Sequence, residues 1–345
     1  MTQKNERLLF ADLLKVLAIY LVLWGHCVQQ FFTTSPLEND VYVYIYSFHM
    51  PLFMVLSGYF SISSMSLAFG DFLKKKAQQL LLPLFFWSVI VFFLYIVLDY
   101  FFLHKDIDHL WRDSLVRTFG NFWFLKSLFV CYLITWCGKK TKLPSWAWVI
   151  ATLLLSQLVA KYNVKIMFPC FMAGMALRKY SGFIKRNRIS IFVISSLVFL
   201  LMLFYWNGNF LKPANLMQAL SEKNLDSIGK ELFVRVYRMM IGISASISFY
   251  LSFMFLFEKT NNLFLNKMAA MGQYTLSVYL LQVLLLEILM GEVLCLDSMN
   301  NTPVNYIVIP LISLFVLLVC IKTSNLICKS EIAGFLLFGR KSNRH

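Results

Sequence analysis

The chain has 345 residues, of which 59% are hydrophobic and only 14% charged, and its formal net charge is +15. Soluble domains carry roughly 25% charged residues, and a soluble fold cannot bury the apolar runs of 18 or more residues that recur here. The composition excludes a soluble globular protein and predicts an all-α, polytopic bundle of transmembrane helices. The basic excess does not indicate nucleic acid, because Lys and Arg collect on the cytoplasmic side of membrane proteins.

About ten apolar segments follow one another along the chain. The first lacks a small-residue cleavage site and is expected to stay in the protein as a helix rather than be removed as a signal peptide. The sixth is short and contains Pro169 and Gly174, so nine or eleven spans also fit the pattern. The ten segments are Leu8–Phe32, Val41–Met65, Leu80–Leu103, Gly120–Cys137, Ser145–Ala160, Val164–Leu177, Ile189–Trp206, Val236–Phe257, Tyr274–Met290 and Asn305–Ile321.

The cations between these segments are distributed unevenly. If the N-terminus is cytoplasmic, the inner segments hold about twice as many Lys and Arg as the outer ones, which predicts that both termini lie in the cytoplasm. The chain is then one membrane domain, residues 1–345, with a transmembrane bundle over 8–321 and a cytoplasmic tail over 322–345. Three basic loops would face the cytoplasm and bind lipid head groups or cofactor phosphates: Lys74–Lys76, Lys139–Lys142 and Lys185–Arg188.

The first segment carries its polar side chains on one stripe. Asp12 and Lys15 are three residues apart, so they share a helix face and are expected to neutralise each other. Arg7 lies just before them and is expected to reach the head groups. His26 follows Lys15 by eleven residues, about three turns and roughly 16 Å further along the same face. Because ionisable groups inside a membrane are costly, each needs a partner or a function, and a structural ion pair is the alternative for the first two.

A second histidine, His49, opens the second segment at about the depth of His26, so two imidazoles could converge near the outer surface. A core histidine that hydrogen-bonds a neighbouring helix is the alternative for His26. Pro51, Ser57 and Gly58 follow in the same segment. Such helix-disturbing or small residues expose backbone carbonyls or let helices approach closely.

The fourth segment carries Lys126, a further charge inside the membrane, with Glu287 of the ninth segment as a candidate partner. Trp123 lies three residues before this lysine, where an aromatic anchor at the membrane interface is the alternative to a functional role. The seven cysteines lie mostly within apolar segments and form no CxxC pair. We therefore expect packing thiols and no metal site.

These motifs resemble those of the acyltransferase type 3 family of integral membrane acyltransferases, which modify extracytoplasmic glycans and related molecules. The spacing of Arg, Asp, Lys and His in Arg7–His26 is similar to the first-helix signature of the family, and Phe48–Tyr59 is similar to its second-helix signature. The resemblance covers most of the chain through five further stretches, which are Asp71–Pro83 with Trp87, Phe122–Leu128, Phe168–Gly174, Gly272–Leu280 and Leu336–Gly339.

By position, the resemblance implies that His26 is the catalytic histidine and that Lys15 stands where many members have arginine. It also places His49, Ser57 and Gly58 in the second motif and Trp123 in the fourth-helix motif, with His49 as a second catalytic residue and Ser57 and Trp123 in supporting roles. Lys15 offers a point charge in place of a bidentate guanidinium, which removes a clamp on a phosphate but keeps charge neutralisation.

A further departure concerns the ninth segment. Gln282 stands where many relatives have a histidine, so a base at that position is lost. The search for a base then narrows to the histidines of the first and second segments.

The resemblance implies a membrane O-acyltransferase similar to polysaccharide and fucose O-acetyltransferases. We expect it to move an acetyl group from cytoplasmic acetyl-CoA to a hydroxyl of a cell-surface glycan or its lipid-linked precursor, among the lipids of a bacterial inner membrane. Arg7 and Lys15 would bind the donor phosphates, while Asp12 and Lys126 would support the site. His26 would act as base or carry the acyl group, with His49 taking the other role.

A transporter or flippase is the alternative from another functional class. Intramembrane charges and proline-broken helices also mark substrate pathways. The sequence shows no pair of matched broken helices in two related halves, which counts against this alternative.

Overall fold

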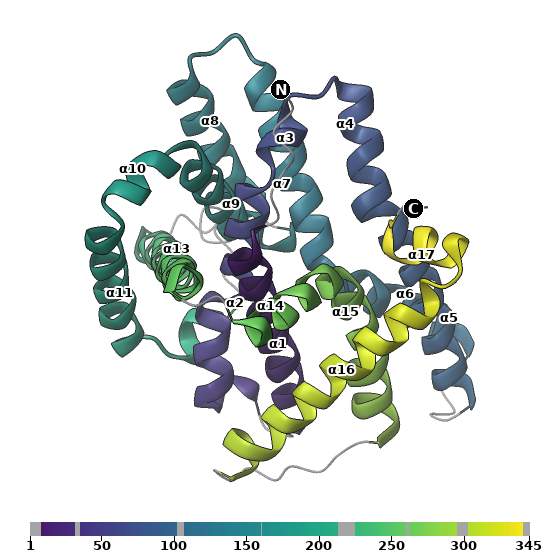
Figure 1. Cartoon of the computed structure of the whole chain (residues 1–345). Helices are drawn as coiled ribbons and strands as arrows, with labels where there is room; N and C mark the ends of the chain where they lie inside the picture. The colour runs from purple at the N-terminus through teal and green to yellow at the C-terminus, as the bar shows by residue number, and fades with distance from the viewer. Residues whose placement is uncertain are drawn as a thin grey trace.

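The structure is a computed structural model that describes residues 8–31, 35–101, 107–159, 161–212, 225–259, 262–294 and 303–340. These residues are almost entirely helical and contain no strand, so the predicted all-α class is confirmed (Figure 1). The α-helices are α1 (Leu9–Phe31), α2 (Asp40–Tyr59), α3 (Ile62–Met65), α4 (Phe69–Lys76), α5 (Leu82–Phe101), α6 (Ile107–Gly120), α7 (Trp123–Lys140), α8 (Ser145–Leu158), α9 (Val164–Lys179), α10 (Ser181–Arg186), α11 (Arg188–Phe204), α13 (Leu225–Lys259), α14 (Leu263–Ala270), α15 (Thr275–Gln282), α16 (Ile309–Ile327) and α17 (Glu331–Phe338).

Shorter helical turns join or extend these helices. Three of them are π-helical and continue a neighbouring α-helix, which widens the helix locally. The 3₁₀ turns are η1 (Pro36–Glu38), η3 (Lys161–Asn163), η4 (Gly208–Leu211) and η5 (Met271–Tyr274), and the π-helical turns are η2 (Ala77–Leu81), η6 (Val283–Leu294) and η7 (Val304–Val308).

Six helical runs in the described part of the chain are long and apolar enough to cross a membrane, and α6 with α7 forms a seventh candidate that bends by 57°. The protein is therefore a multi-pass membrane protein. Each of the ten predicted segments coincides with a helix, but α8, α9 and α11 have only 14, 16 and 17 residues. Ten crossings and two cytoplasmic termini stay predictions. The six runs are Leu9–Phe31, Asp40–Tyr59, Phe69–Phe101, Leu225–Glu258, Leu263–Gly291 and Val304–Ile327.

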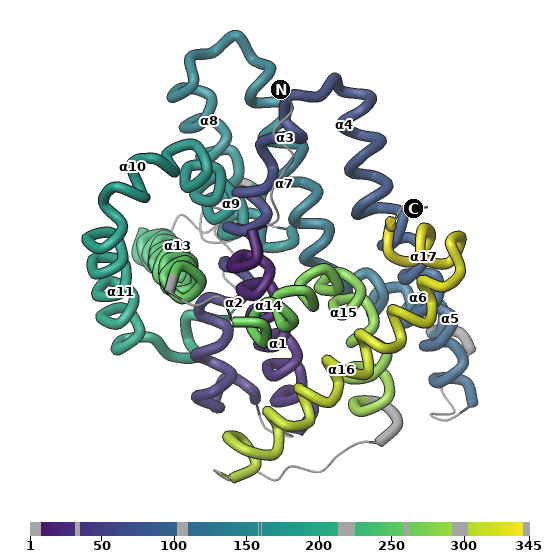
Figure 2. The backbone as a smooth tube through the Cα atoms, viewed as in Figure 1, coloured from purple at the N-terminus to yellow at the C-terminus, as the bar shows by residue number. Residues whose placement is uncertain are grey.

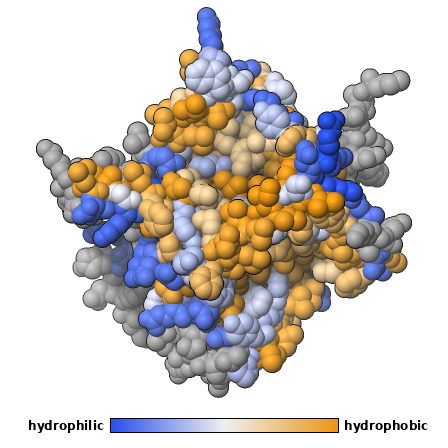
Figure 3. All heavy atoms as spheres, turned by 90° about the vertical axis from the view of Figure 1, so that its left-hand side faces the viewer, coloured by the Kyte–Doolittle hydropathy of each residue, from blue (hydrophilic) through white to orange (hydrophobic). Residues whose placement is uncertain are grey.

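Exposed apolar side chains cover the outside of the bundle. Figure 3 shows one such face, on the side of α11 and α13, where hydrophobic residues form a broad area with hydrophilic residues around it. Helix α11 exposes seven large apolar side chains there, which in water would be unfavourable and in lipid is expected. They are Ile189, Val193, Ile194, Leu197, Leu200, Leu201 and Phe204.

Two glycines bring α2 and α9 into backbone contact in the core. A Cβ atom on Gly58 would lie 1.9 Å from the carbonyl oxygen of Phe171, and one on Gly174 would lie 1.9 Å from that of Val55. Small residues allow such close crossings between membrane helices. The close approach predicted for the Ser57–Gly58 region is confirmed.

Helices α1 and α2 run antiparallel through the centre of the bundle (Figure 2). Lys15 Nζ lies 4.6 Å from the ring centre of Phe60, and Gln29 Nε2 donates to the Tyr42 hydroxyl at 3.0 Å. The start of α1 therefore meets the end of α2, and the end of α1 meets the start of α2. We name the first of these the basic end and the second the distal end.

The basic end collects cations from several helices. Lys76 Nζ lies 3.7 Å from the ring centre of Tyr132, Arg178 donates to the Tyr59 hydroxyl at 3.1 Å, and Lys140 lies near the Trp136 ring. The loop between α7 and α8 and the turn before α4 lie at this end of the molecule (Figure 1).

The last described residues belong to the bundle. Trp87 Nε1 on α5 donates to the Leu337 carbonyl at 2.8 Å, and a Cβ atom on Gly339 would lie 2.5 Å from the Gln78 carbonyl oxygen. Helix α16 also continues to Ile327. Residues 322–340 thus continue α16 and pack against α5 and η2, and the predicted cytoplasmic side of this segment stays a prediction.

Candidate active site

An apolar cavity of about 430 Å³ opens at the basic end, and we name it the inner cavity. Lys15, Ile19 and Val22 line it on successive turns of α1. Phe53 of α2 and Leu128 of α7 cover other parts of the wall. Because most of this wall is apolar, the cavity suits a narrow hydrophobic or amphipathic chain better than a sugar.

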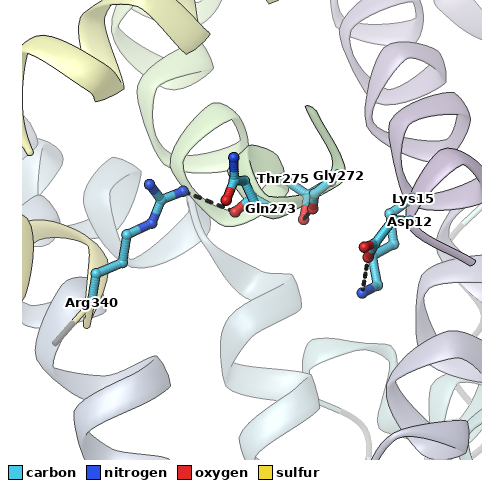
Figure 4. Close-up of polar contacts among 6 residues, drawn as sticks. All are labelled: Asp12, Lys15, Gly272, Gln273, Thr275 and Arg340. Carbon is cyan, nitrogen blue, oxygen red and sulfur yellow. Dashed lines mark hydrogen bonds and ion pairs between the residues drawn. The ribbon is translucent and has the colours of Figure 1, made fainter. Parts of the chain in front are cut away.

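The ion pair predicted at the start of α1 is present. Lys15 Nζ donates to Asp12 Oδ1 at 3.0 Å, which confirms the i,i+3 pair. Figure 4 shows this pair on α1, on the opposite side of the Gly272–Thr275 turn from Arg340. Arg7 lies outside the described residues.

Ser57 of the second motif also lines the inner cavity. Its backbone carbonyl accepts a hydrogen bond of 3.5 Å from the Tyr132 hydroxyl. The second motif therefore contributes Ser57 to the cavity wall and Gly58 to the contact with α9.

A polar cavity of about 520 Å³ opens at the distal end, and we name it the outer cavity. Its wall is rich in side-chain amides and ionisable groups. Side chains of this kind offer both donors and acceptors, as recognition of a hydroxyl-rich molecule requires. The groups with hydrogen-bonding side chains are His26, Gln29, Gln30, Tyr95, Arg117, Asn121 and Glu287.

His26 and Glu287 face each other in this cavity. His26 Nδ1 lies 3.8 Å from Glu287 Oε1, and each side chain is 22% exposed. The nitrogen has no hydrogen-bond partner within the described part of the chain, so it is available to this carboxylate. Such pairs are often longer in ligand-free sites than in the reacting complex.

Two amides hold the other side of the carboxylate. With its amide oriented to satisfy both neighbours, Asn121 donates to Glu287 Oε2 at 3.1 Å and accepts from the Tyr95 hydroxyl at 3.1 Å. Gln282 is a further polar neighbour of the Glu287 side chain.

A second buried pair lies beside this site. Arg117 donates to both carboxylate oxygens of Asp99, at 3.1 and 3.2 Å, and its guanidinium carbon lies 3.9 Å from the ring centre of Tyr95. Asp99 is fully buried. The carboxylate neutralises the guanidinium, so the pair adds hydrogen-bonding groups to the outer cavity with little net charge.

The two cavities lie next to each other along the same helices. Val22 of α1 lines the inner cavity, and His26, one turn later, lines the outer cavity. In the same way, Tyr279 of α15 lines the inner cavity and Glu287 of η6 lines the outer cavity. The π-helical form of η6 is a feature that is frequent at functional sites.

The junction of α6 and α7 also crosses this boundary. Asn121 lines the outer cavity and Phe124 the inner one. Between them Phe122 has a left-handed backbone, with φ 53°, and α6 and α7 meet there at a 57° bend. A left-handed phenylalanine is strained. The bend is therefore kept by packing, and it points two nearby side chains into different cavities.

His49 does not converge with His26 on a cavity. It is 2% exposed, and its Nδ1 lies 2.7 Å from the carbonyl oxygen of Ile45. A carbonyl only accepts, so Nδ1 carries the proton. The ring also packs edge-on against Tyr46, whose own ring contacts Gly25. His49 lines neither cavity, and its burial against Tyr46 favours a positioning role over the predicted role as base or acyl carrier.

Lys126 does not pair with Glu287. Its Nζ donates to the carbonyl oxygens of Phe119 and Asn121, at 2.7 and 3.3 Å. These carbonyls are exposed by the break between α6 and α7, and a cation at the end of a helix stabilises them. The candidate pairing is therefore wrong, and Lys126 supports the bend that carries Asn121.

Trp123 begins α7 and is half-buried. Its ring packs edge-on against Phe124, with 6.1 Å between the ring centres. Trp123 thus lies behind the wall of the inner cavity, next to a side chain that forms that wall.

The comparisons with known proteins show the family of the chain. Residues 8–322 match the family described as "Acyltransferase domain". The chain belongs to this acyltransferase family. The acyltransferase prediction is confirmed by this match, which covers nearly the whole chain and favours an enzyme over the transporter alternative.

Two curated relatives of this family member are both nodulation protein NolL. The one from Mesorhizobium japonicum is 31% identical over 138 residues, which is 38% of this chain and 35% of the relative. The one from Sinorhizobium fredii is 32% identical over 139 residues, 38% of this chain and 36% of the relative. The chain thus aligns with about a third of the length of these relatives. No solved structure matches.

Two features of the candidate site were missed in the sequence. The His26–Glu287 pair joins helices that are 261 positions apart, and the Asp99–Arg117 pair joins two segments assigned to different environments. A carboxylate inside an apolar run was the available signal for Glu287 and Asp99. Within the described residues, no group of three or more His, Cys, Asp or Glu could hold a metal ion.

Proposed function

We propose that the protein is a membrane O-acetyltransferase that moves an acetyl group from cytoplasmic acetyl-CoA to a hydroxyl of a cell-surface glycan or its lipid-linked precursor. The observation that carries the proposal is the position of His26, beside Glu287 in the outer cavity and one turn from Val22 of the inner cavity. A residue at this boundary can act on molecules that enter from opposite ends.

The inner cavity is the proposed path of the donor. The basic end would face the cytoplasm, where Lys and Arg are enriched in membrane proteins. Lys15 and His26 are eleven residues apart on α1, or roughly 16 Å along the axis. A pantetheine arm lying along this apolar wall would bring its thioester toward Val22 while the nucleotide stays at the mouth.

The outer cavity is the proposed site of the acceptor. Gln29, Gln30 and Asn121 offer amides that can both donate and accept hydrogen bonds. Such groups match the hydroxyls of a sugar. The Asp99–Arg117 pair would add oriented donors without a strong net charge.

The His26–Glu287 pair supports general-base chemistry. Glu287 would accept a hydrogen bond from Nδ1–H and so hold the imidazole in the tautomer that leaves Nε2 as the base. Nε2 would take the proton of the acceptor hydroxyl as its oxygen attacks the thioester carbonyl. The C–S bond then breaks, and the imidazolium returns the proton to the thiolate, which gives the ester and CoA. The Glu287 carboxylate would stabilise the transient imidazolium.

His49 would position the site without touching the reactants. Its edge contact with Tyr46 holds a ring that packs on Gly25, the residue before His26. The Asp12–Lys15 pair would hold the start of α1 at the mouth of the donor cavity.

The test is His26→Ala expressed in a strain that lacks the native gene, with the amount of membrane protein measured by immunoblot. We expect the O-acetyl content of the surface glycan, measured by NMR, to fall to the level of the deletion strain. The turnover number should drop by roughly 10²- to 10⁴-fold, the usual contribution of a general base. Unchanged acetylation at an equal protein level would refute the assignment of His26.

A further inference from the structure

The mouth of the inner cavity holds two cations whose partners differ. Lys15 is already paired with the Asp12 carboxylate at 3.0 Å. Arg340 has neutral partners: its Nη2 donates to the Gln273 carbonyl at 2.8 Å, and its guanidinium carbon lies 4.8 Å from the ring centre of Tyr274. It makes no ion pair within the described ranges. The net positive charge of this mouth therefore comes from Arg340.

Arg340 is held in place by the end of α17. Gly339 has φ 63°, a left-handed conformation that ends the helix and suits glycine. A Cβ atom there would lie 2.5 Å from the Gln78 carbonyl oxygen, so the chain lies tightly against η2. Phe338, Gly339 and Arg340 all line the inner cavity as a result.

The η5 turn lies between Lys15 and Arg340. A Cβ atom on Gly272 would lie 2.4 Å from the Asp12 carbonyl oxygen, so η5 packs directly on α1 beside Lys15. The next residue, Gln273, accepts the hydrogen bond from Arg340 (Figure 4). The turn thus links Arg340 to the start of α1 across the cavity mouth.

We infer that Arg340 binds the phosphate-bearing nucleotide end of the acyl donor. This inference rests on the proposed function, because it assumes a CoA thioester in the inner cavity. A guanidinium has five N–H donors and stays protonated, and its planar fork matches two phosphate oxygens. One of these donors holds Gln273 and a second lies 3.8 Å from the Cys328 sulfur, which leaves further donors for a ligand.

A phosphate on a lipid head group has the same chemistry, so the test must separate the two sources. The experiment is calorimetric titration of the full chain in detergent with CoA, which carries the phosphates, and with pantetheine, which lacks them. The variants are Arg340→Gln, Arg340→Lys and, as a control, Lys329→Gln. Lys329 is an exposed cation between α16 and α17 and does not line the cavity.

We expect Arg340→Gln to raise the Kd for CoA roughly tenfold, the effect of losing one charge-assisted hydrogen bond. Arg340→Lys should keep part of the affinity, since it restores charge without the fork. Pantetheine binding should not change, which also shows that the variant is folded. Lys329→Gln should bind both ligands like the unaltered protein.

Equal CoA affinity in Arg340→Gln and the unaltered protein would overturn the inference and leave the proposed function intact. Equal losses for CoA and pantetheine would also overturn it, because Arg340 would then act through a lipid or through the fold. Failure of the unaltered protein to bind CoA would instead count against the donor of the proposed function.

Discussion

The inner and outer cavities differ in what their walls can recognise. The inner cavity, about 430 Å³, is lined mostly by aliphatic and aromatic side chains, with cations at its mouth. The outer cavity, about 520 Å³, is lined by amides, by Arg117 of the Asp99–Arg117 pair and by the His26–Glu287 pair. An apolar wall suits a flexible thioester arm, and a polar wall suits a hydroxyl-bearing acceptor. The chemistry is expected where the two walls meet, at the distal end of α1.

After His26→Ala, the largest effect is expected for Glu287→Gln. The variant keeps the shape of the side chain but removes the charge that would stabilise the imidazolium of His26, so the turnover number should fall roughly 10²-fold. Steady-state kinetics with labelled acetyl-CoA would measure it. The KM for the donor should change little, because Glu287 does not line the inner cavity.

Lys126→Met is the matched comparison for that variant. It removes a charge in the same region, but Lys126 contacts the carbonyls of Phe119 and Asn121 and not Glu287. We expect lower stability and a smaller loss of turnover than in Glu287→Gln. If the folded fraction of Lys126→Met loses as much turnover as Glu287→Gln does, the special role of the Glu287–His26 pair would be contradicted.

A variant that fills the inner cavity should weaken the donor alone. Leu128→Trp places an indole into the wall beside Phe124, and we expect the KM for acetyl-CoA to rise roughly tenfold, as lost space costs about 1 to 3 kcal/mol. Leu154→Trp, on the exposed face of α8, is the control and should behave like the unaltered protein. A rise in the acceptor KM instead would reverse the roles of the two cavities.

The smallest effect is expected in the outer cavity. Asn121→Ala removes the amide between Tyr95 and Glu287, and we expect kcat/KM for the acceptor to fall roughly fivefold, the value of one neutral hydrogen bond. Donor binding, measured by titration with CoA, should be unchanged. If CoA affinity falls and the acceptor constant does not, the division between the cavities is wrong.

Local patterns in the sequence predicted much of the fold. The apolar runs predicted the helices, because a membrane helix can be recognised from hydropathy and length alone. The i,i+3 spacing predicted the Asp12–Lys15 pair. The small residues near Gly58 predicted a close helix contact, although not that α9 makes it. These features depend on residues near one another in the chain.

Such local patterns could not predict which side chains meet across the bundle. Lys126 seemed a partner for Glu287 because both lie in the outer half of the membrane, but the 57° bend gives it carbonyls at a shorter distance. His49 lies near the depth of His26, but its side chain is buried. That burial depends on which face of α2 packs against its neighbours, and the sequence does not give this. Arg340 follows the last apolar run, and only the packing of α17 brings it to the cavity.

The central claim is that donor and acceptor reach His26 from opposite sides of the membrane. The most direct test adds acetyl-CoA labelled in the acetyl group, which does not cross membranes, to sealed inside-out and right-side-out vesicles from cells that make the protein and its natural acceptor. His26→Ala vesicles give the background. We predict label in the glycan fraction of inside-out vesicles only, and label in right-side-out vesicles only after permeabilisation. Equal labelling of intact right-side-out vesicles would contradict the account.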